Sequence, residues 1–169
     1  KISLWVKYLF DMSVIDSKNL DIEELFVYIE RDLFQPDLSN SPLGNYEKQC
    51  LTDKIKQMHC QSCFQKGFCV PIALDAFDFE EACVAEKVYL STVSGDTIAE
   101  IFRHLDTEWR NMYSNAILNL IFKEEPTMEC LAEILEKLES LPNLDYLHWG
   151  VCIGRSASTN YCIELITYS

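Results

Sequence analysis

The fold prediction rests on residues 97–122, which read TIAEIFRHLDTEWRNMYSNAILNLIF. Their apolar side chains recur at intervals of three and four residues, which places them on one face of an α-helix. Thr97 and Glu100 stand three residues apart at the start, as in a helix-capping box. We therefore predict one long amphipathic helix, with an apolar face formed by Ile98, Ile101, Phe102, Leu105, Trp109, Met112, Ala116, Ile117, Leu120 and Ile121.

A second amphipathic helix is predicted over residues 127–140. Thr127 is a suitable N-cap residue, and the apolar positions that follow are Met128, Leu131, Ile134, Leu135 and Leu138. Only residues 123–126 separate the two helices, and so short a link makes them antiparallel neighbours. The segments 97–122/127–140 are thus predicted to form an antiparallel helical hairpin.

The remaining segments complete a fold that we predict to be mainly α. Residues 35–49 are rich in Pro, Ser, Asn and Gly, which predicts an exposed loop. Residues 151–168 hold two β-prone runs around a polar turn, and their periodicity fits either a small C-terminal β-hairpin or a final helix. We expect a single compact helical domain over residues 1–169. Apolar spacing predicts its further helices over residues 2–12 (which also permit a short strand), 21–34, 51–66 and 77–92.

Four of the eight cysteines lie between residues 50 and 69, and they leave three alternatives open. Cys60 and Cys63 have the Cys-x2-Cys spacing of half a zinc site, because a tight turn aims both thiolates at one ion. Cys50 and Cys69 would have to complete the site, with His59 in reserve, since no second pair of that kind is present. Disulfides and reduced thiols are the other two alternatives. We predict no cofactor other than this structural zinc.

The net charge of −13 is spread along the chain rather than gathered in a tail. Such a field disfavours nucleic acid and anionic lipid, whose binding needs Lys and Arg to neutralise phosphates. No apolar run approaches the ~20 residues that span a bilayer. We therefore expect another protein as the partner, and a basic one, although solubility alone also explains an acidic surface.

A local group of lysines and aromatic residues interrupts this acidity. It surrounds the cysteines, and such a patch is suited to bind an acidic peptide or nucleic acid. A solvated helix face is the simpler explanation of the lysines. The predicted partner-binding residues are Lys54, Lys56, Phe64, Lys66 and Phe68, together with Trp149.

The sequence contains no Gly-rich phosphate loop and no nucleophile elbow, so no catalytic residue is assigned. We predict a protein-interaction or adaptor module that binds a peptide or helix of a basic partner. The alternative is a zinc-binding protein or a Cys/His-dependent hydrolase built on the cysteines of residues 50–69. Such a hydrolase would use His59 or His148 with Cys60, Cys63 or Cys152.

Length and composition favour an intracellular, reduced protein. The chain has 169 residues, of which 49% are hydrophobic, so it can bury a core without disulfides. It also lacks an Asn-X-Ser/Thr glycosylation motif. A secreted, disulfide-bonded protein is the alternative, because the number of cysteines is even. The first residue is Lys1 rather than methionine, which we interpret as the mark of a segment excised from a longer protein.

Overall fold

The computed structural model describes residues 35–62, 68–72, 74–109, 112–154 and 158–169. For residues 60–62 and 68–71 it describes the backbone alone. The helices predicted over residues 2–12 and 21–34 lie outside the described residues.

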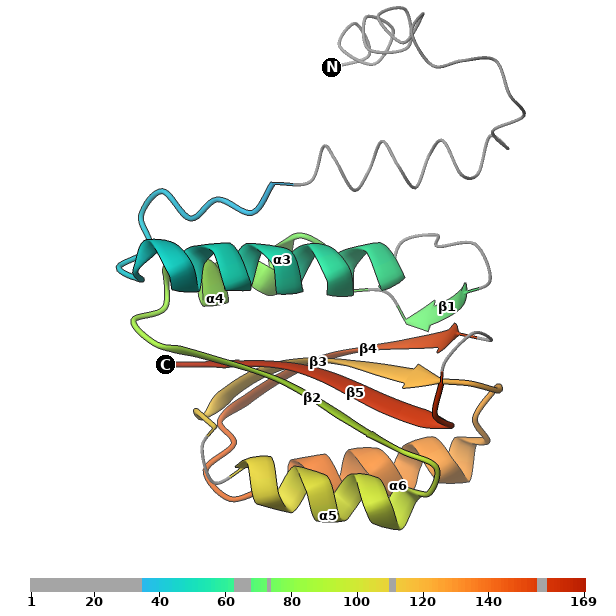
Figure 1. Ribbon diagram of the computed structural model, residues 1–169. Helices are drawn as coiled ribbons and strands as arrows, with labels where there is room; N and C mark the ends of the chain where they lie inside the picture. The colour runs from blue at the N-terminus through green and yellow to red at the C-terminus, as the bar shows by residue number, and fades with distance from the viewer. Residues whose placement is uncertain (1–34, 63–67, 73, 110–111, 155–157) are drawn as a thin grey trace, which may run out of the picture.

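The centre of the fold is a mixed sheet of five strands (Figure 1). The strand order across the sheet is β1-β4-β3-β5-β2. Strand β3 runs parallel to β4, and every other neighbouring pair is antiparallel. The strands are β1 (Phe68–Ile72), β2 (Val88–Gly95), β3 (Asn115–Phe122), β4 (Tyr146–Gly154) and β5 (Tyr161–Tyr168).

Helices cover both faces of this sheet and give three layers (Figure 1). The 18-residue helix α3 (Asn45–Ser62) lies on one face, together with the 3-10 turn η1 (Phe77–Phe79) and the short helix α4 (Glu80–Val84). Helices α5 (Ile98–Glu108) and α6 (Met128–Glu139) lie on the other. Each layer of helices encloses its own apolar cluster against the sheet.

The prediction of a mainly helical domain is therefore wrong, and residues 97–122 show why. Helix α5 ends at Glu108, and residues 115–122 form β3, the central strand. Helices cover both of its faces, and every residue from Ala116 to Phe122 is buried. A strand buried on both faces reads as a continuous apolar run, and such a run satisfies helical spacing as well as any other.

The predicted helical hairpin is a β3–α6–β4 crossover instead. The second helix exists, and Thr127 caps it by accepting a hydrogen bond from the backbone N–H of Cys130 at 3.2 Å. The cap at Thr97 is also confirmed, with the N–H of Glu100 as its donor at 3.2 Å. Both caps are local features. Whether the segment before α6 is a helix or a strand depends instead on the whole sheet, in which it forms β3.

Three further predictions are corrected. The β-prone C-terminal runs do form strands, but β3 lies between β4 and β5, so these strands do not pair as a hairpin. Residues 77–92, predicted as one helix, contain η1, α4 and the first part of β2. Helix α3 begins at Asn45, within the segment 35–49 that was predicted to be a loop.

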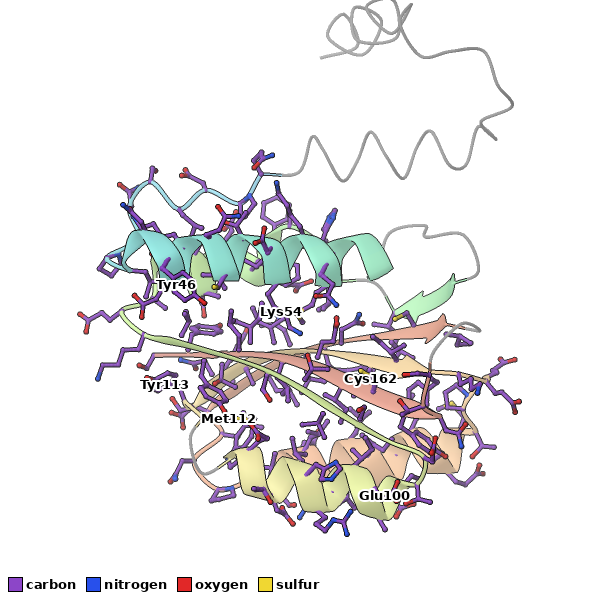
Figure 2. The ribbon with its side chains drawn as sticks, viewed as in Figure 1. Tyr46, Lys54, Glu100, Met112, Tyr113 and Cys162 are labelled. Carbon is purple, nitrogen blue, oxygen red and sulfur yellow. The ribbon has the colours of Figure 1, made fainter. Side chains whose placement is uncertain are left out.

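A buried polar contact fixes α3 on the sheet, and its central residue is Lys54, which Figure 2 labels between α3 and the strands. Lys54 lies on the buried side of α3, and its Nζ donates a hydrogen bond to Thr92 Oγ1 at 2.8 Å. The same Nζ lies 3.7 Å from Glu164 Oε1, to which Gln57 also donates. Lys54 is 8% exposed and Glu164 is 2% exposed. Because a buried charge is tolerated only beside its partner, this contact defines how α3 sits over β5 and β2.

We expect the substitution Lys54→Met to lower the free energy of unfolding by about 3 kcal/mol, because it removes the lysine cation that lies beside the buried Glu164 carboxylate. The double variant Lys54→Met/Glu164→Gln should recover much of that loss, since it removes both charges and keeps an acceptor for Gln57. Urea unfolding followed by circular dichroism measures both. Equal losses in the single and double variants would contradict the buried ion pair.

Candidate functional site

The structure separates the predicted partner-binding residues. Lys54 lies inside the domain beneath α3, while Trp149 of β4 packs against the cluster formed with α5 and α6 on the other face. These two side chains therefore share no surface. Lys56 is partly exposed on α3. Phe64 and Lys66 lie outside the described residues, and Phe68 begins β1 with only its backbone described.

The predicted zinc ligands are only partly described. Cys50 and Cys60 lie on α3, Cys69 lies on β1, and Cys63 falls outside the described residues. Among the residues that the structure describes, no three His, Cys, Asp or Glu side chains are grouped as ligands of one metal ion. Because the side chains of Cys60 and Cys69 are not described, the zinc site stays a prediction.

Three other thiols have a raised pKa: Cys83 and Cys152 are buried, and Cys162 is partly buried. Burial raises the pKa of Cys83 and of Cys162 to about 11, and that of Cys152 to about 12. The thiol of Cys152 donates to Asn119 Oδ1 at 3.7 Å, between β4 and β3. A thiol with so high a pKa carries almost no thiolate near neutral pH, and the thiolate is the nucleophile.

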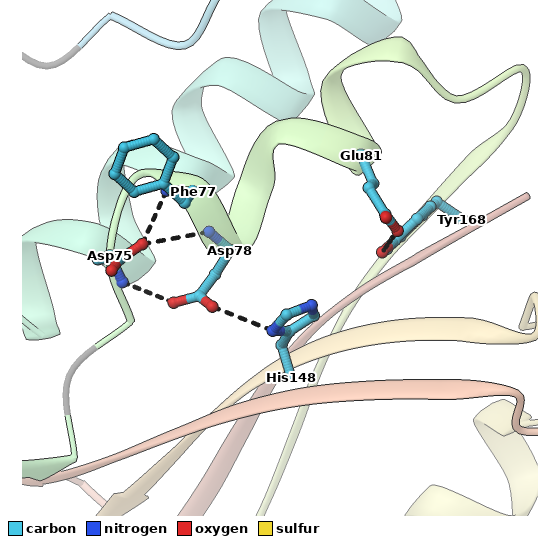
Figure 3. Close-up of polar contacts among 6 residues, drawn as sticks. All are labelled: Asp75, Phe77, Asp78, Glu81, His148 and Tyr168. Carbon is cyan, nitrogen blue, oxygen red and sulfur yellow. Dashed lines mark hydrogen bonds and ion pairs between the residues drawn. The ribbon is translucent and has the colours of Figure 1, made fainter.

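His148 belongs to a polar cluster that anchors η1 to the sheet (Figure 3). Its Nδ1 lies 3.0 Å from Asp78 Oδ1. Asp78 Oδ2 accepts from the N–H of Asp75 at 2.7 Å, and Asp75 Oδ1 accepts from the N–H groups of Phe77 and Asp78. The two carboxylates thus cap the turn reciprocally, and His148 ties the capped turn to β4.

This cluster does not join His148 to Cys152, one of the thiols of the hydrolase alternative. The two residues lie four positions apart on β4, a separation of about 13 Å at the rise of a β-strand. Cys152 is fully buried and its pKa is about 12. The geometry gives His148 a structural contact with Asp78 and no nucleophile on its own strand.

The edge of the sheet formed by β2 is the feature that no sequence motif indicated. Figure 1 shows β2 crossing in front of the other strands. It pairs with β5 over eight consecutive residues in an unbroken register, and no other described strand lies beyond it. Its sequence, VYLSTVSG, contains neither a charged residue nor a proline. We call residues 88–95 the β2 edge.

The hydrogen bonds beside this strand show which backbone groups face outward. Lys87 and Ser169 exchange both of their main-chain hydrogen bonds, at 3.2 and 3.1 Å. Because bonded and non-bonded pairs alternate along an antiparallel ladder, the odd-numbered residues that follow Lys87 bond to β5. The N–H and C=O groups of Val88, Leu90 and Thr92 therefore point away from the sheet.

His104 of α5 confirms this phase. Its Nδ1 donates to the carbonyl oxygen of Ser94 at 3.1 Å, which requires that carbonyl to point outward. The contact closes one end of the β2 edge. For Val88, Leu90 and Thr92, no backbone hydrogen-bond partner occurs on the outer side within the described part of the chain.

Helices on both sides hold the β2 edge in place. On one face Leu90 packs against the cluster beneath α3, and Thr92 accepts from Lys54. On the other, Tyr89 and Ser91 donate to Glu108 Oε2 at the end of α5, at 2.7 and 3.1 Å. The strand therefore presents its outward groups from a backbone that is anchored on both faces.

The opposite edge strand, β1, has features that hinder pairing with a further strand, and β2 lacks them. Strand β1 contains Pro71, which has no N–H to donate, and its register against β4 shifts between Cys69 and Ile72. A proline and a bulge are two of the devices by which proteins block edge-to-edge pairing. The β1 end of the sheet is thus protected against a further strand, whereas β2 has neither feature and no described strand pairs with its outer side.

Sequence reasoning missed the β2 edge because residues 77–92 were predicted as a helix. The run Tyr-Leu-Ser-Thr-Val-Ser over residues 89–94 alternates in polarity over part of its length, is β-branched in two positions and ends at a glycine. These signals favour a strand. Its place at the outside of the sheet follows only from the strand order.

Comparison with known proteins identifies the fold and no more. No protein-family model matches the sequence, and no curated protein matches it either. The structure is similar to FtsZ from M. jannaschii, solved as an empty FtsZ dimer, with a TM-score of 0.51 and 16% identity. A point mutant of the same FtsZ gives 0.50 and 12%. At such identities the likeness shows an α/β fold.

The similarity covers most of this chain but only part of FtsZ. It spans 87% of this chain and 43% of the FtsZ dimer chain, and 90% and 42% for the mutant. The chain therefore corresponds to less than half the length of either neighbour. Separately, every described helix is too short or too polar to cross a lipid bilayer.

We expect the buried thiols to resist alkylation. At about pH 7.5, iodoacetamide should label the partly exposed Cys50 well before Cys83, Cys152 and Cys162, because the pKa of all three is raised and burial also restricts access to Cys83 and Cys152. Their labelling should accelerate only as the pH rises toward 11. Peptide mass spectrometry measures the order, with urea-unfolded protein as the control. Early labelling of Cys152 in the folded protein would contradict this order and support Cys152 as a nucleophile.

Proposed function

We propose that this domain is a protein-interaction module that binds an extended segment of a partner as an added strand on the β2 edge. The observation that carries the proposal is the contrast between the two edges of the sheet. Strand β1 has a proline and a register shift, whereas β2 has an unbroken register and outward groups at Val88, Leu90 and Thr92.

Strand addition uses groups that are already in position. Each outward N–H and C=O group can form one inter-strand hydrogen bond, and each such bond contributes about 0.5–1.5 kcal/mol net. An added strand then gains specificity from side chains that alternate between the two faces. Because α3 and α5 fix both faces of β2, little conformational entropy is lost from this side of the complex.

Binding at a strand edge favours one of the two kinds of segment predicted from the sequence, which were a peptide and a helix. An exposed strand edge recognises an extended peptide through its main chain, whereas a partner helix needs an apolar groove between elements. The outward groups of β2 therefore favour a peptide over a helix as the bound segment. The acidic composition of the chain, with its net charge of −13, supports a basic partner.

Amide exchange tests the arrangement of the β2 edge. In the free protein, the amides of Leu90 and Thr92 should exchange rapidly, and those of Ser91 and Val93 should exchange slowly, because only the latter are bonded to β5. A linear peptide selected from a displayed random library should slow exchange at Leu90 and Thr92. Nuclear magnetic resonance resolves each amide. Uniform exchange along the strand would contradict the assignment of the outward groups.

Two substitutions at Thr92 test whether its outward N–H group is needed for binding. Thr92→Pro removes the outward N–H, whereas Thr92→Ala keeps it, and both lose the hydroxyl that accepts from Lys54. We expect the selected peptide to bind the alanine variant as it binds the original protein, and to lose at least tenfold in affinity with the proline variant. Far-ultraviolet circular dichroism checks that both are folded. Equal binding by the two variants would overturn strand addition.

A further inference from the structure

We propose that Glu108 gives the β2 edge its selectivity, by pairing with a Lys or Arg side chain of the added strand on the α5 face of the sheet. This inference rests on the proposed strand addition and adds the chemistry of the bound segment. The segment that fits has basic residues at alternate positions and β-branched or other apolar residues between them.

The carboxylate of Glu108 is held at the edge by the strand itself. Its Oε2 accepts from the hydroxyl of Tyr89 at 2.7 Å and from Ser91 Oγ at 3.1 Å. Donation to the carboxylate raises the pKa of the Tyr89 phenol, because the neutral phenol is the form that donates. Glu108 is partly exposed, so a charged group can approach it from the open side of β2.

The register of an added strand brings its side chains to this carboxylate. Directly opposed residues of neighbouring strands share a face, with Cβ atoms about 4.5–5.5 Å apart. A residue opposite Tyr89 or Ser91 therefore lies on the α5 face, beside Glu108. A Lys or Arg at that position has the length to reach Oε1 or Oε2. Residues opposite Leu90 and Thr92 lie on the α3 face, where they extend an apolar surface.

Glu108 is the available acid at this position. The neighbouring Asp106 on α5 already pairs with Lys137 of α6 at 2.8 Å. Within the described part of the chain, Glu108 has hydroxyl donors and no ion pair. The other charged side chain on this stretch of α5 is the exposed Arg103, one turn before Asp106 and Thr107, and the neighbouring His104 is engaged by the carbonyl of Ser94.

Charge argues against a second copy of the chain as the occupant. Two β2 edges paired antiparallel about Ser91 would place both Glu108 side chains on the same face and near the two-fold axis. Each copy also carries a net charge of −13. Like charges opposed in this way are destabilising, whereas a basic segment gains from the same two features.

Three synthetic nine-residue peptides test the inference on the full chain. They alternate valine with lysine, with glutamine or with glutamate, and are otherwise identical. At low ionic strength we expect the lysine peptide to slow amide exchange at Leu90 and Thr92 and to bind about fivefold more tightly than the glutamine peptide, the range of a partly exposed ion pair. The glutamate peptide should bind most weakly, and added salt should reduce the differences.

Two neutralising variants separate a specific pair from general charge. Glu108→Gln keeps an acceptor for Tyr89 and Ser91 and should abolish the preference for lysine. Asp106→Asn changes the net charge equally, on the same helix, and should retain the preference, because Asp106 faces Lys137. Isothermal titration calorimetry measures the affinities. An equal effect of the two variants would show only a general charge effect and overturn the assignment to Glu108.

The remaining outcomes distinguish this inference from the function on which it rests. Protection of Leu90 and Thr92 by the lysine and glutamine peptides at equal affinity would overturn basic recognition and leave strand addition intact. Failure of every peptide to protect these amides would overturn strand addition itself. Sedimentation as a dimer with the same amides protected before any peptide is added would identify a second copy as the occupant and overturn the proposal.

Discussion

The constraint on which the structure depends is the burial of β3 on both faces. Seven consecutive residues of this strand are buried, and only helices above and below the sheet together can cover them. Leu118 and Leu120 face α5 and α6, whereas Ile117 faces α3. Asn119 is the polar exception, and Cys152 of β4 donates to it. The three-layer arrangement is the direct consequence of covering this one strand.

The sheet has two edge strands, β1 and β2, and they differ in regularity. At β1, Pro71 and a shifted register interrupt the ladder. At β2 the ladder is regular, and polar contacts from both helical layers reach the strand: Lys54 at Thr92 and Glu108 at Ser91. These contacts stiffen the edge without covering it. A strand edge that is already ordered loses little conformational entropy when an extended segment binds to it, so the β2 edge is suited to such binding.

Local features could be predicted from the sequence, and long-range ones could not. Thr97 and Thr127 were recognised as caps because a cap depends on residues three positions away. The apolar run of β3 also predicts a helix, because an unbroken apolar run fits both the helix and the strand period. Lys54 was expected on the surface, since its partner Glu164 lies 110 positions further along the chain. The β2 edge depends on strand order, which no local pattern encodes.

Strand β2 itself carries no charged residue that would oppose pairing with a second copy of the chain. Edge strands are commonly guarded by lysine or proline on the strand itself, and the β2 edge carries neither. On the α5 face the strand is contacted by the charged side chain of Glu108, which accepts hydrogen bonds from Tyr89 and Ser91. In the proposed complex, an acid in that position would repel an identical edge and attract a basic segment, so one side chain would supply both discrimination against copies of the chain and affinity for a partner. Because two hydroxyls immobilise the carboxylate before any partner arrives, it contributes this selectivity at a small entropic cost.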